Sequence, residues 1–590
     1  MDFFSILALV GGLGLFLYGM DVMGANLKKL AGGSLESILS KLTSNKLTGF
    51  LLGFVVTAVI QSSSATTVML VGFVNSGIMK LGQTLGIIMG ANVGTTVTSW
   101  ILSLTGISGG SFFLKMLKPS SFTPILMIVG VVMIMVCKSE KKKDIAHILI
   151  GFSVLMFGMN MMSDAMSGLK DSPAFGQMLI MFSNPVMGIL TGTLLTAVIQ
   201  SSSASVGILQ ALALTGAIPY STAIPIILGQ NIGTTITPIL SAITGNTESK
   251  RVAMACLYIK ILGVLAFCAV FYGLNAVLGF GFMSTNVTVL SIATFHTLFN
   301  VFSTIVLLPF TNPIEKITIK SIPAKVKEET SVFDTLDDRF LAIPAFATEK
   351  CRELVCEMAM IAQESVADAT LLLTKFDKKM LDSIKEREEL VDMYEDKIGT
   401  YLVKVAEANL TSQDSKIVTE LQYCIGEIER ISDYSYHIAK SAEELKEKKI
   451  SFSESAVQEI KVIVGAVNEV MQLTVEAFEK NDMEMAHLVE PLQQVIERIK
   501  NKIRLNHVIR LQEGLCSVEL GFILSDLLNA LERIAGHCSN VAVCQLEISH
   551  GTFEAHEYLT QVRESDKNFS TMYESYKEKY KVASKQQANA

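Results

Sequence analysis

The sequence predicts an all-α protein in two parts, a polytopic membrane domain with inverted repeats followed by a soluble helical bundle. Half of the 590 residues are hydrophobic, and the apolar stretches, which end near Leu308, contain an internal repeat. Charged residues make up only 18%, against about a quarter in soluble domains. Beyond Pro323 the chain becomes rich in Glu, Lys, Asp and Arg. We expect a membrane domain over 1–310, a linker over 311–330 and a soluble helical domain over 331–590.

Composition and motifs exclude several classes of function. The net charge of −7 argues against nucleic acid as a partner. The nine cysteines form no CxxC pair, which is typical of reduced thiols in a chain that faces the cytoplasm. The sequence has no P-loop, HExxH motif or nucleophile–base constellation. We expect neither enzymatic activity nor an organic cofactor.

An internal repeat organises the apolar half. Residues 57–101 recur as residues 196–240 at a constant offset of 139 without a gap, and 19 of the 45 aligned positions are identical. The match extends upstream, so repeat one covers about 15–101 and repeat two about 154–240. A gapless match of this length indicates a duplication.

The repeats combine full spans with half-length segments. A membrane crossing needs about 20 apolar residues, and we expect seven crossings, near 3–27, 81–105, 121–137, 145–163, 220–244, 252–279 and 287–309. The segments that flank the motif Gln61–Ser64 are each about half this length and predict a re-entrant hairpin, as do those around Gln200–Ser203. Three crossings separate the starts of the two repeats, so the copies are inverted.

The positive residues of the loops predict the orientation. One set of loops carries Lys28, Lys29, Lys41, Lys46, Lys80, Lys138, Lys141, Lys142, Lys143, Lys250 and Arg251, and the other only Lys115, Lys118 and Lys170. We expect a multi-pass protein of the plasma (inner) membrane, with its N-terminus outside and its C-terminal domain in the cytoplasm. Inverted repeats with polar breaks are the architecture of a secondary transporter, whose substrate site lies near the bilayer midplane.

The two QSSS motifs carry the candidate substrate site. Each motif precedes a half-helix, so hydroxyl groups and unpaired backbone N–H groups are available at a helix N-terminus, which binds anions. Two such ends that converge from opposite sides would hold a tetrahedral oxyanion. The candidate ligands are Gln61, Ser62, Ser63, Ser64, Gln200, Ser201, Ser202 and Ser203.

A second pair of motifs, GANVGTT and GQNIGTT, interrupts two of the predicted spans. Glycines permit an unwound backbone, and the amide and hydroxyl side chains supply oxygen ligands for a small hard cation. We interpret six residues as Na⁺ ligands or as support for the anion site: Asn92, Thr95, Thr96, Asn231, Thr234 and Thr235. The alternative, that these small polar residues serve helix packing, fits four breaks in register less well.

Three ionisable residues within the apolar half have two interpretations each. Asp21 is either a functional intramembrane carboxylate or the stabiliser of a helix end near Lys28. We expect Lys260 to snorkel to the interface, the alternative being a cation that faces the anion path. His296, which Asn300 follows, is interpreted as a helix-packing donor rather than a gate.

The motifs TAVIQSSSATT, TAVIQSSSAS, GANVGTT, GQNIGTT and FHTLFN resemble those of the type II sodium/phosphate cotransporter family over roughly residues 1–315. The resemblance implies Na⁺-coupled transport of inorganic phosphate, with the QSSS residues lining the phosphate and Na⁺ sites. The chain departs from the family in one place. After Arg251, Cys256 and Lys260 stand where the family has His and Asn, so the role of this helix differs from the usual one.

The C-terminal half predicts about seven amphipathic helices in a bundle. Glu427–Ala439 and Ala530–Ala542 resemble each other at an offset of 103, and with His507–Cys516 they resemble the PhoU-type phosphate-uptake regulator domain. That resemblance implies a regulatory role and a divalent metal held by E-x-x-x-D runs. The candidate ligands are Glu429, Asp433 and Glu532. Since Gly536 replaces the second aspartate, a solvated helix face with Glu–Arg pairs is the preferred interpretation.

The functional hypothesis is sodium-coupled phosphate transport by alternating access, with inorganic phosphate, sodium ions and the lipid bilayer as partners. Transport of another oxyanion such as sulfate or arsenate, phosphate export, and a membrane-bound phosphate-status regulator are the alternatives. The sequence leaves a homodimer or a regulatory protein partner open.

Overall fold

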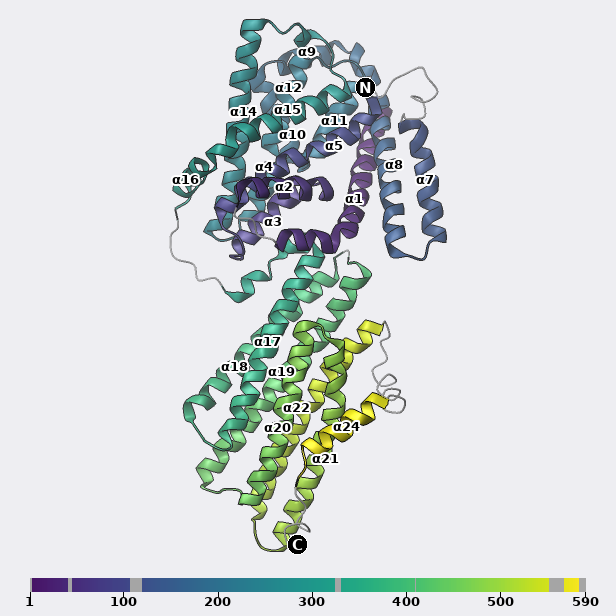
Figure 1. The fold of residues 1–590 in the computed structure, drawn as a ribbon. Coiled ribbons are helices and arrows are strands. Elements are labelled where there is room, and N and C mark those ends of the chain that lie inside the picture. Colours follow the sequence, from purple (N-terminus) through teal and green to yellow (C-terminus); the bar gives the residue numbers. More distant parts are fainter. Residues whose placement is uncertain are drawn as a thin grey trace. The chain divides into compact units, whose positions relative to one another are not determined.

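The structure is a computed structural model that describes residues 3–40, 45–106, 119–323, 331–408, 410–550 and 567–582. Every named element in these ranges is a helix, which confirms the all-α fold class. The chain divides into two compact units, Met1–Ala345 and Phe346–Ala590 (Figure 1). We call them the membrane unit and the C-terminal unit, and describe each by itself.

Among its described residues the membrane unit has six helices that are long and apolar enough to cross a bilayer: Phe3–Leu30, Leu81–Gly106, Glu140–Leu169, Tyr220–Ala242, Thr247–Leu278 and Val289–Ser321. A seventh is counted if the bent pair Ala174–Phe182 and Pro185–Ile199 forms one span. The expected span near 121–137 is helix α7 (Pro119–Val136), whose apolar part is shorter than a full crossing. The length and composition of the described helices thus support a multi-pass membrane protein.

The expected half-length segments form separate helices in both repeats. In repeat one they are α2 (Lys46–Ile60) and α3 (Ser63–Asn75), and in repeat two α10 (Pro185–Ile199) and α11 (Ser202–Leu214). The first helix of each pair begins at an asparagine cap. The side-chain oxygen of Asn45 accepts from the backbone N–H of Leu47, and that of Asn184 accepts from the N–H of Val186, both at 3.0 Å. Asn45 and Asn184 are 139 residues apart, so the duplication preserved this start signal.

The remaining membrane helices surround these hairpins. α1 (Phe3–Ser40) packs along α8 (Glu140–Met166), its counterpart in repeat two, and α8 also packs on α7. The interrupted spans are α4 (Leu81–Gly94) with α5 (Thr96–Ser103), and α12 (Tyr220–Gly233) with α13 (Ile236–Ala242). α2 packs on α4 and α10 on α12, and α14 (Thr247–Leu278) packs on α15 (Val289–Leu307).

Glycines allow the hairpins to approach the interrupted helices. A Cβ atom on Gly90 of α4 would lie 1.9 Å from the carbonyl oxygen of Phe50, and one on Gly229 of α12 would lie 2.0 Å from that of Ile189. Both pairs are related by the offset of 139. No side chain fits at either position, so the close backbone contact is a property of both repeats.

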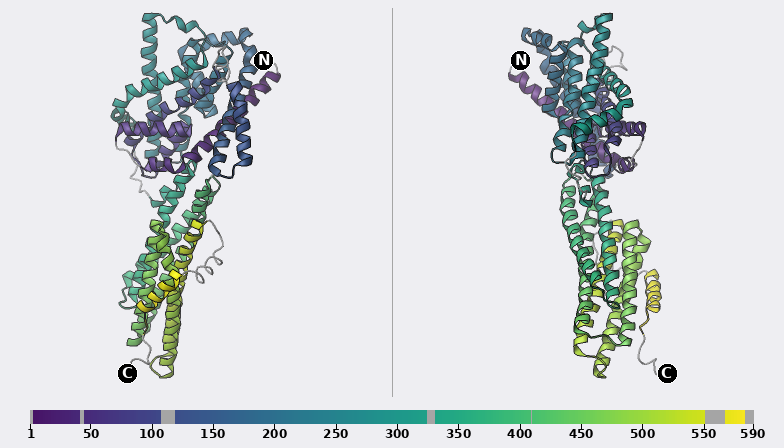
Figure 2. Two further views of the ribbon diagram at one scale, coloured as in Figure 1. Left: turned by 45° about the vertical axis from the view of Figure 1, so that its right-hand side comes forward. Right: turned by 90° about the vertical axis from the view of Figure 1, so that its left-hand side faces the viewer.

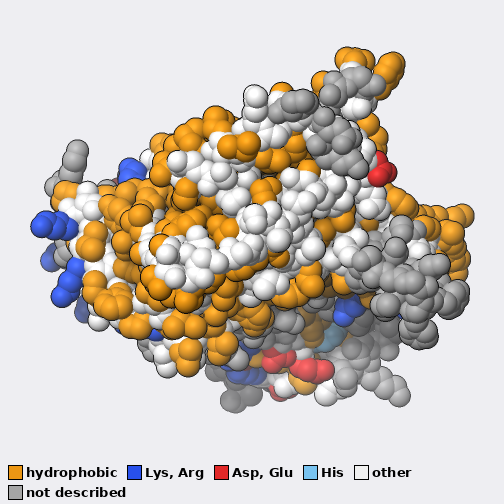
Figure 3. All heavy atoms as spheres, turned by 90° about the horizontal axis from the view of Figure 1, so that it is seen from above, with side chains coloured by type: hydrophobic (Ala, Val, Ile, Leu, Met, Phe, Trp, Pro, Cys, Tyr) orange, Lys and Arg blue, Asp and Glu red, His pale blue; other side chains and the backbone are white. Residues whose placement is uncertain are grey.

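Hydrophobic side chains cover much of the face of the membrane unit seen in Figure 3. Large apolar residues such as Met135, Val198 and Val277 are more than four-fifths exposed. Exposure of this extent is costly in water and favourable in hydrocarbon.

The described part of the predicted linker, residues 311–323, belongs to the membrane unit. Residues Thr311–Ser321 form helix α16, and the 3₁₀ turn Asp338–Ala342 packs on α3. In the preceding 3₁₀ turn, Val332–Thr335, the carbonyl of Asp334 accepts a hydrogen bond from the hydroxyl of Ser76, which follows α3. We call Ser331–Ile343 the docking segment. The ring of Phe340, which is 1% exposed, lies 5.3 Å from the ring of Phe73. The two compact units divide between Ala345 and Phe346, just after the docking segment, and the domain bounds expected from the sequence stay a prediction.

The C-terminal unit is a helical bundle whose long helices run side by side in both views of Figure 2. Its described helices are α17 (Pro344–Leu372), α18 (Lys378–Ala406), α19 (Ser412–Lys448), α20 (Glu454–Lys480), α21 (Met483–Gln512), α22 (Val518–His550) and α24 (Lys567–Lys579). The two segments that resemble each other lie on α19 and α22, which pack together. There Glu427 accepts hydrogen bonds from Asn540, at 2.6 Å, and binds Nδ1 of His537 at 2.9 Å.

Candidate functional site

Each QSSS motif makes a short break between two helices. Gln61 ends α2 in the left-handed region with φ 58°, and Ser62 caps α3 by accepting the N–H of Ala65 at 3.2 Å. Gln200 and Ser201 repeat this geometry, again with φ 58°. A left-handed glutamine costs about 1–2 kcal/mol relative to the right-handed conformation, so the surrounding structure must hold it. Strain of this kind clusters at functional sites.

Buried hydroxyl pairs hold the two half-helices of each hairpin together. The hydroxyl of Thr57 on α2 donates to that of Thr66 on α3 at 3.0 Å. In repeat two the hydroxyl of Thr196 donates to that of Ser205 at 2.9 Å. All four residues are at most 1% exposed. The same kind of buried hydroxyl pair therefore joins the two half-helices of the hairpin in both repeats.

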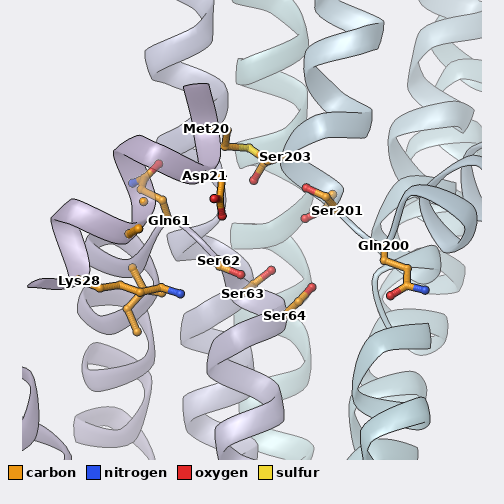
Figure 4. Close-up of a pocket in the computed structure, with 14 residues that line it drawn as sticks. Met20, Asp21, Lys28, Gln61, Ser62, Ser63, Ser64, Gln200, Ser201 and Ser203 are labelled. Carbon is orange, nitrogen blue, oxygen red and sulfur yellow. The ribbon is translucent and has the colours of Figure 1, made fainter. Parts of the chain in front are cut away.

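The two motifs line one cavity of about 200 Å³. Its lining comprises Met20, Asp21, Gly24, Ala25, Lys28, Ile60, Gln61, Ser62, Ser63, Ser64, Gln200, Ser201, Ser202 and Ser203. All eight residues that the sequence predicts as anion ligands are among them. In Figure 4 the serine hydroxyls of both motifs lie around a common space, although the motifs are 139 residues apart in the chain.

The chemistry of this cavity suits an oxyanion. The N-termini of α3 and α11 both lie at the cavity, and the first N–H groups of a helix have no partner within that helix. These N–H groups carry a partial positive charge, and together with the adjacent serine hydroxyls they can donate hydrogen bonds to the oxygens of an anion without any formal charge of their own. The serines at the caps, Ser62 and Ser201, already accept a backbone hydrogen bond, so their hydroxyl protons remain available for donation.

Helix α1 supplies the residues that the sequence reasoning did not assign to this site. Asp21 was singled out with two interpretations, and the structure places it in the cavity wall. Lys28 was considered only as a loop charge, yet it also lines the cavity. The signal that could have found it is its spacing of seven residues from Asp21, about two helical turns, which puts both on one face of α1.

Comparisons with known proteins agree with this site. Residues 15–164 and 155–291, one match for each repeat, fit the family described as Na⁺/Pi-cotransporter, and residues 355–442 and 461–544 fit the PhoU domain. The chain belongs to the Na⁺/Pi-cotransporter family. It is a multi-pass membrane protein of a phosphate-transport family that carries PhoU domains, and this family is one of transporters and not of enzymes.

Individual relatives cover different parts of the chain. The chain is 23% identical over 558 residues to "Putative inorganic phosphate export protein YjbB" of Escherichia coli, which covers 92% of this chain and 98% of that protein. It is 37% identical over 99 residues to sodium-dependent phosphate transport protein 2A of the rat, only 16% of this chain and 15% of that protein. The phosphate-specific transport system accessory protein PhoU homolog 1 of Thermotoga maritima is 28% identical over 189 residues, 32% of this chain and 80% of that protein.

The interrupted helices of this cotransporter-family chain support the QSSS motifs from outside the cavity. The six residues Asn92, Thr95, Thr96, Asn231, Thr234 and Thr235 are buried and do not appear in the cavity lining. The four threonine hydroxyls donate to carbonyl groups three or four residues earlier, at the ends of α4 and α12. From the same region, Thr98 donates to the side-chain oxygen of Gln61 at 2.8 Å, and Gln230 donates to the carbonyl of Ser205 at 2.9 Å. These contacts fit a role of the interrupted helices in supporting the QSSS motifs. Ligation of Na⁺ by the six residues stays a prediction.

The departure from the family motif has a structural consequence. Lys260 does not snorkel, contrary to the preferred expectation, because it is 6% exposed and its ammonium donates to the side-chain oxygen of Asn231 at 2.9 Å. It thereby ties α14 to the interrupted helix α12. Nδ1 of His296 lies 2.8 Å from the hydroxyl of Ser99, which joins α15 to α5, as expected of a packing residue.

Carboxylates also gather in the C-terminal unit. Among the described residues, oxygen atoms of Glu388, Asp392 and Asp433 lie within 4.8 Å of one another, and Glu429 lines the same acidic pocket as Asp392. Burial and the neighbouring Asp433 raise the pKa of both Glu388 and Asp392. An all-carboxylate set suits a hard divalent cation such as Mg²⁺, Mn²⁺ or Ca²⁺. The sequence reasoning missed Glu388 and Asp392, although they form an E-x-x-x-D run of their own.

Glu532, the third residue predicted as a ligand of that metal, is not part of this carboxylate group. Glu532 of α22 accepts a hydrogen bond of 3.3 Å from the ammonium of Lys500 on α21. The structure therefore brings Glu429 and Asp433 together with carboxylates of α18, while Glu532 forms an ion pair.

Proposed function

We propose that the chain performs sodium-coupled transport of inorganic phosphate across the plasma membrane by alternating access, with phosphate held between the two QSSS hairpins. One observation carries the proposal. Two motifs from two copies of a duplicated segment, each at the N-terminus of a half-helix, line a single cavity. Donors from both hairpins then surround one oxyanion, and a site shared by two repeats can open to either side as one moves against the other.

Sodium is the proposed coupling ion. Phosphate is an anion, and its binding among neutral donors is favoured when a cation enters the same cavity. The rat relative is named as sodium-dependent, and it aligns with only part of this chain. In the proposed topology the N-terminus is outside and the C-terminal unit is cytoplasmic, where its PhoU domains have a regulatory role.

The decisive experiment uses the purified full chain in proteoliposomes. Uptake of radiolabelled phosphate is measured with an inward Na⁺ gradient, with a K⁺ gradient, and with equal Na⁺ on both sides. We expect phosphate accumulation only with the Na⁺ gradient. Absence of Na⁺-dependent flux in both orientations of the gradient would refute sodium coupling.

The site assignment needs variants that spare the helix caps. Ser62 and Ser201 accept backbone hydrogen bonds, so alanine there costs about 1 kcal/mol of helix stability as well as a ligand. Ser64→Ala and Ser203→Ala remove cavity hydroxyls that do not cap a helix, and we expect each to raise the phosphate KM. Ser183→Ala, outside the cavity, is the matched control. Unchanged kinetics in Ser64→Ala/Ser203→Ala would refute the site but not the transport.

Export of phosphate is the second candidate, and the alignment over nearly the whole length of a relative named for export favours it. The same proteoliposomes test outward transport, because a reversed Na⁺ gradient drives loaded phosphate outward, and the ratio of the initial inward and outward rates at equal gradients measures the preferred direction. An excess of unlabelled sulfate or arsenate in the uptake assay tests the other oxyanions.

A further inference from the structure

The charge of the proposed transport site comes from a single helix. Of the fourteen residues that line the cavity between the hairpins, two are charged, and both Asp21 and Lys28 belong to α1. The QSSS residues contribute only neutral donors and acceptors. Any interaction of a full charge with a bound ion in this cavity therefore involves α1.

The backbone of α1 lies against the tip of the first hairpin. A Cβ atom on Gly24 would be 3.8 Å from the carbonyl oxygen of Ile60, the last residue of α2. Met20, Asp21, Gly24, Ala25 and Lys28 form one stripe along this face. The small residues in its middle let α1 approach, and the two charged residues stand one at each side of them. In Figure 4 Asp21 lies between the serines of the two motifs, and the ammonium of Lys28 points toward Ser62.

A carboxylate in an oxyanion cavity has a clear electrostatic effect. Asp21 repels phosphate unless a cation lies between them, whereas the ammonium of Lys28 attracts it. We propose that Asp21 is a ligand of the coupling cation, so that the oxyanion binds well only after the cation, and that Lys28 is a cationic ligand of the oxyanion. This inference rests on the proposed function and names the residues that link cation and anion binding in it.

The two repeats are unequal in this respect. The residues 139 positions after Asp21 and Lys28 are Asn160 and Ser167, which are uncharged and are absent from the cavity lining. The QSSS motifs are duplicated while the charges are not, so one repeat carries the cation-dependent element. Asn160→Asp is consequently a matched control, since it places the same carboxylate on the corresponding helix outside the cavity.

The test separates cation affinity from anion affinity in the Na⁺-driven proteoliposome assay. Asp21→Asn keeps the size of the side chain and removes its charge. We expect it to raise the Na⁺ concentration for half-maximal uptake by about tenfold or more, with the phosphate KM at saturating Na⁺ within about twofold of the wild type. Asp21→Glu restores part of the Na⁺ affinity, and Asn160→Asp leaves both constants unchanged.

Lys28 has the opposite signature. Lys28→Gln raises the phosphate KM about tenfold at saturating Na⁺, and Lys28→Arg restores most of the affinity. Equal Na⁺ dependence in Asp21→Asn and wild type, or an equal phosphate KM in Lys28→Gln and wild type, overturns the corresponding half of the inference. The elution volume and thermal midpoint of each purified variant identify those that fail to fold.

A further measurement distinguishes this inference from the proposed function itself. Equilibrium binding of radiolabelled phosphate to the purified full chain is measured in NaCl and in choline chloride, without any gradient. If the wild type shows no Na⁺-driven flux, the proposed coupling fails, and Lys28→Gln still lowers phosphate binding about tenfold if Lys28 is an anion ligand. Unchanged binding in that variant overturns the role of Lys28 whatever the flux assay shows.

Discussion

The side-chain amide of Asn75, the last residue of α3, donates a hydrogen bond of 3.0 Å to the carboxylate of Asp337 in the docking segment. The side-chain oxygen of Asn75 also accepts a hydrogen bond of 2.9 Å from the backbone N–H of Asn246. The backbone carbonyl of Asn75 accepts one of 2.8 Å from the side-chain amide of Asn246. The end of one re-entrant hairpin is thus joined both to the loop before α14 and to the segment from which the chain continues into α17.

The docking segment depends on the burial of Phe340. Phe340→Ala removes a ring that is 1% exposed and packs on Phe73, a change that costs about 3–5 kcal/mol in a protein core. We expect amide hydrogen exchange of residues 331–343 to become much faster while that of α4 and α12 is unchanged. Val332→Ala, at a residue that is 47% exposed, is the control. Equal exchange in the two variants would show that Phe340 does not anchor the segment.

The hydroxyl pairs of the hairpins predict an order of stabilities. Thr66 accepts from Thr57 and donates to the carbonyl of Ser62, so Thr66→Val leaves the buried donor of Thr57 unpaired. We expect this variant to lose about 1–3 kcal/mol, whereas Thr57→Val loses about 1 kcal/mol. Thermal unfolding in detergent measures both, and Thr196→Val in repeat two should match Thr57→Val. A reversed order would contradict the assigned direction of the hydrogen bond.

Much of this architecture could be predicted from the sequence because it depends on patterns within short stretches of the chain. The duplication, the polar breaks and the change of composition identify hairpins, repeats and two parts without any tertiary information. The eight QSSS residues were predicted to meet because inversion of the repeats brings them together, and they line one cavity.

What the sequence did not predict depends on contacts between distant segments. The docking of Phe340 on Phe73 and the Lys260–Asn231 hydrogen bond each join residues that share no local pattern. The hydroxyls of the GTT motifs looked free because their partners, backbone carbonyls three or four residues earlier, carry no sequence signature.

The close contact of hairpin and interrupted helix predicts strong effects of single methyl groups. Gly90→Ala and Gly229→Ala each place a Cβ atom about 2 Å from a carbonyl oxygen, so the helices must separate. Overpacking of this kind costs about 1–3 kcal/mol or more. We expect both variants to lower the yield of folded protein and to shift its thermal midpoint downward. Gly273→Ala, where nothing lies within 4 Å, should leave both unchanged.

The buried pair of Asn231 and Lys260 predicts a compensating double mutant. Asn231→Leu removes the side chain that binds the ammonium of Lys260, and hydrogen bonds to charged groups contribute about 1.5–3 kcal/mol. The variant should be destabilised by at least that amount. Asn231→Leu/Lys260→Met removes both polar groups and should recover most of the loss. Asn92→Leu, at the equivalent position of repeat one, is the control, because adding Lys260→Met to it should recover none of the stability that it loses.

The acidic pocket of the C-terminal unit predicts a pH dependence with a definite sign. Burial and Asp433 raise the pKa of Glu388, Asp392 and Glu429, so the folded state holds protons that the unfolded state releases. The stability contributed by these protons is complete below the unfolded values near pH 4 and is lost as the pH rises through the folded values. Without a divalent cation, the protection against hydrogen exchange in α18 and α19 of the full chain, relative to the intrinsic exchange rate at each pH, should fall as the pH is raised toward 7, and less so in Asp433→Asn.

A divalent cation should reverse this effect at neutral pH if the pocket holds one, as we propose. Binding at about 100 times the dissociation constant stabilises the folded state by about 2.7 kcal/mol. Adding Mn²⁺ or Mg²⁺ should therefore slow exchange in α18 and α19 of the wild type but not of Asp433→Asn. Glu532→Gln is the informative control, because Glu532 pairs with Lys500 and lies outside the carboxylate group. If Glu532→Gln abolished the protection as completely as Asp433→Asn does, the cation would lie elsewhere in the bundle.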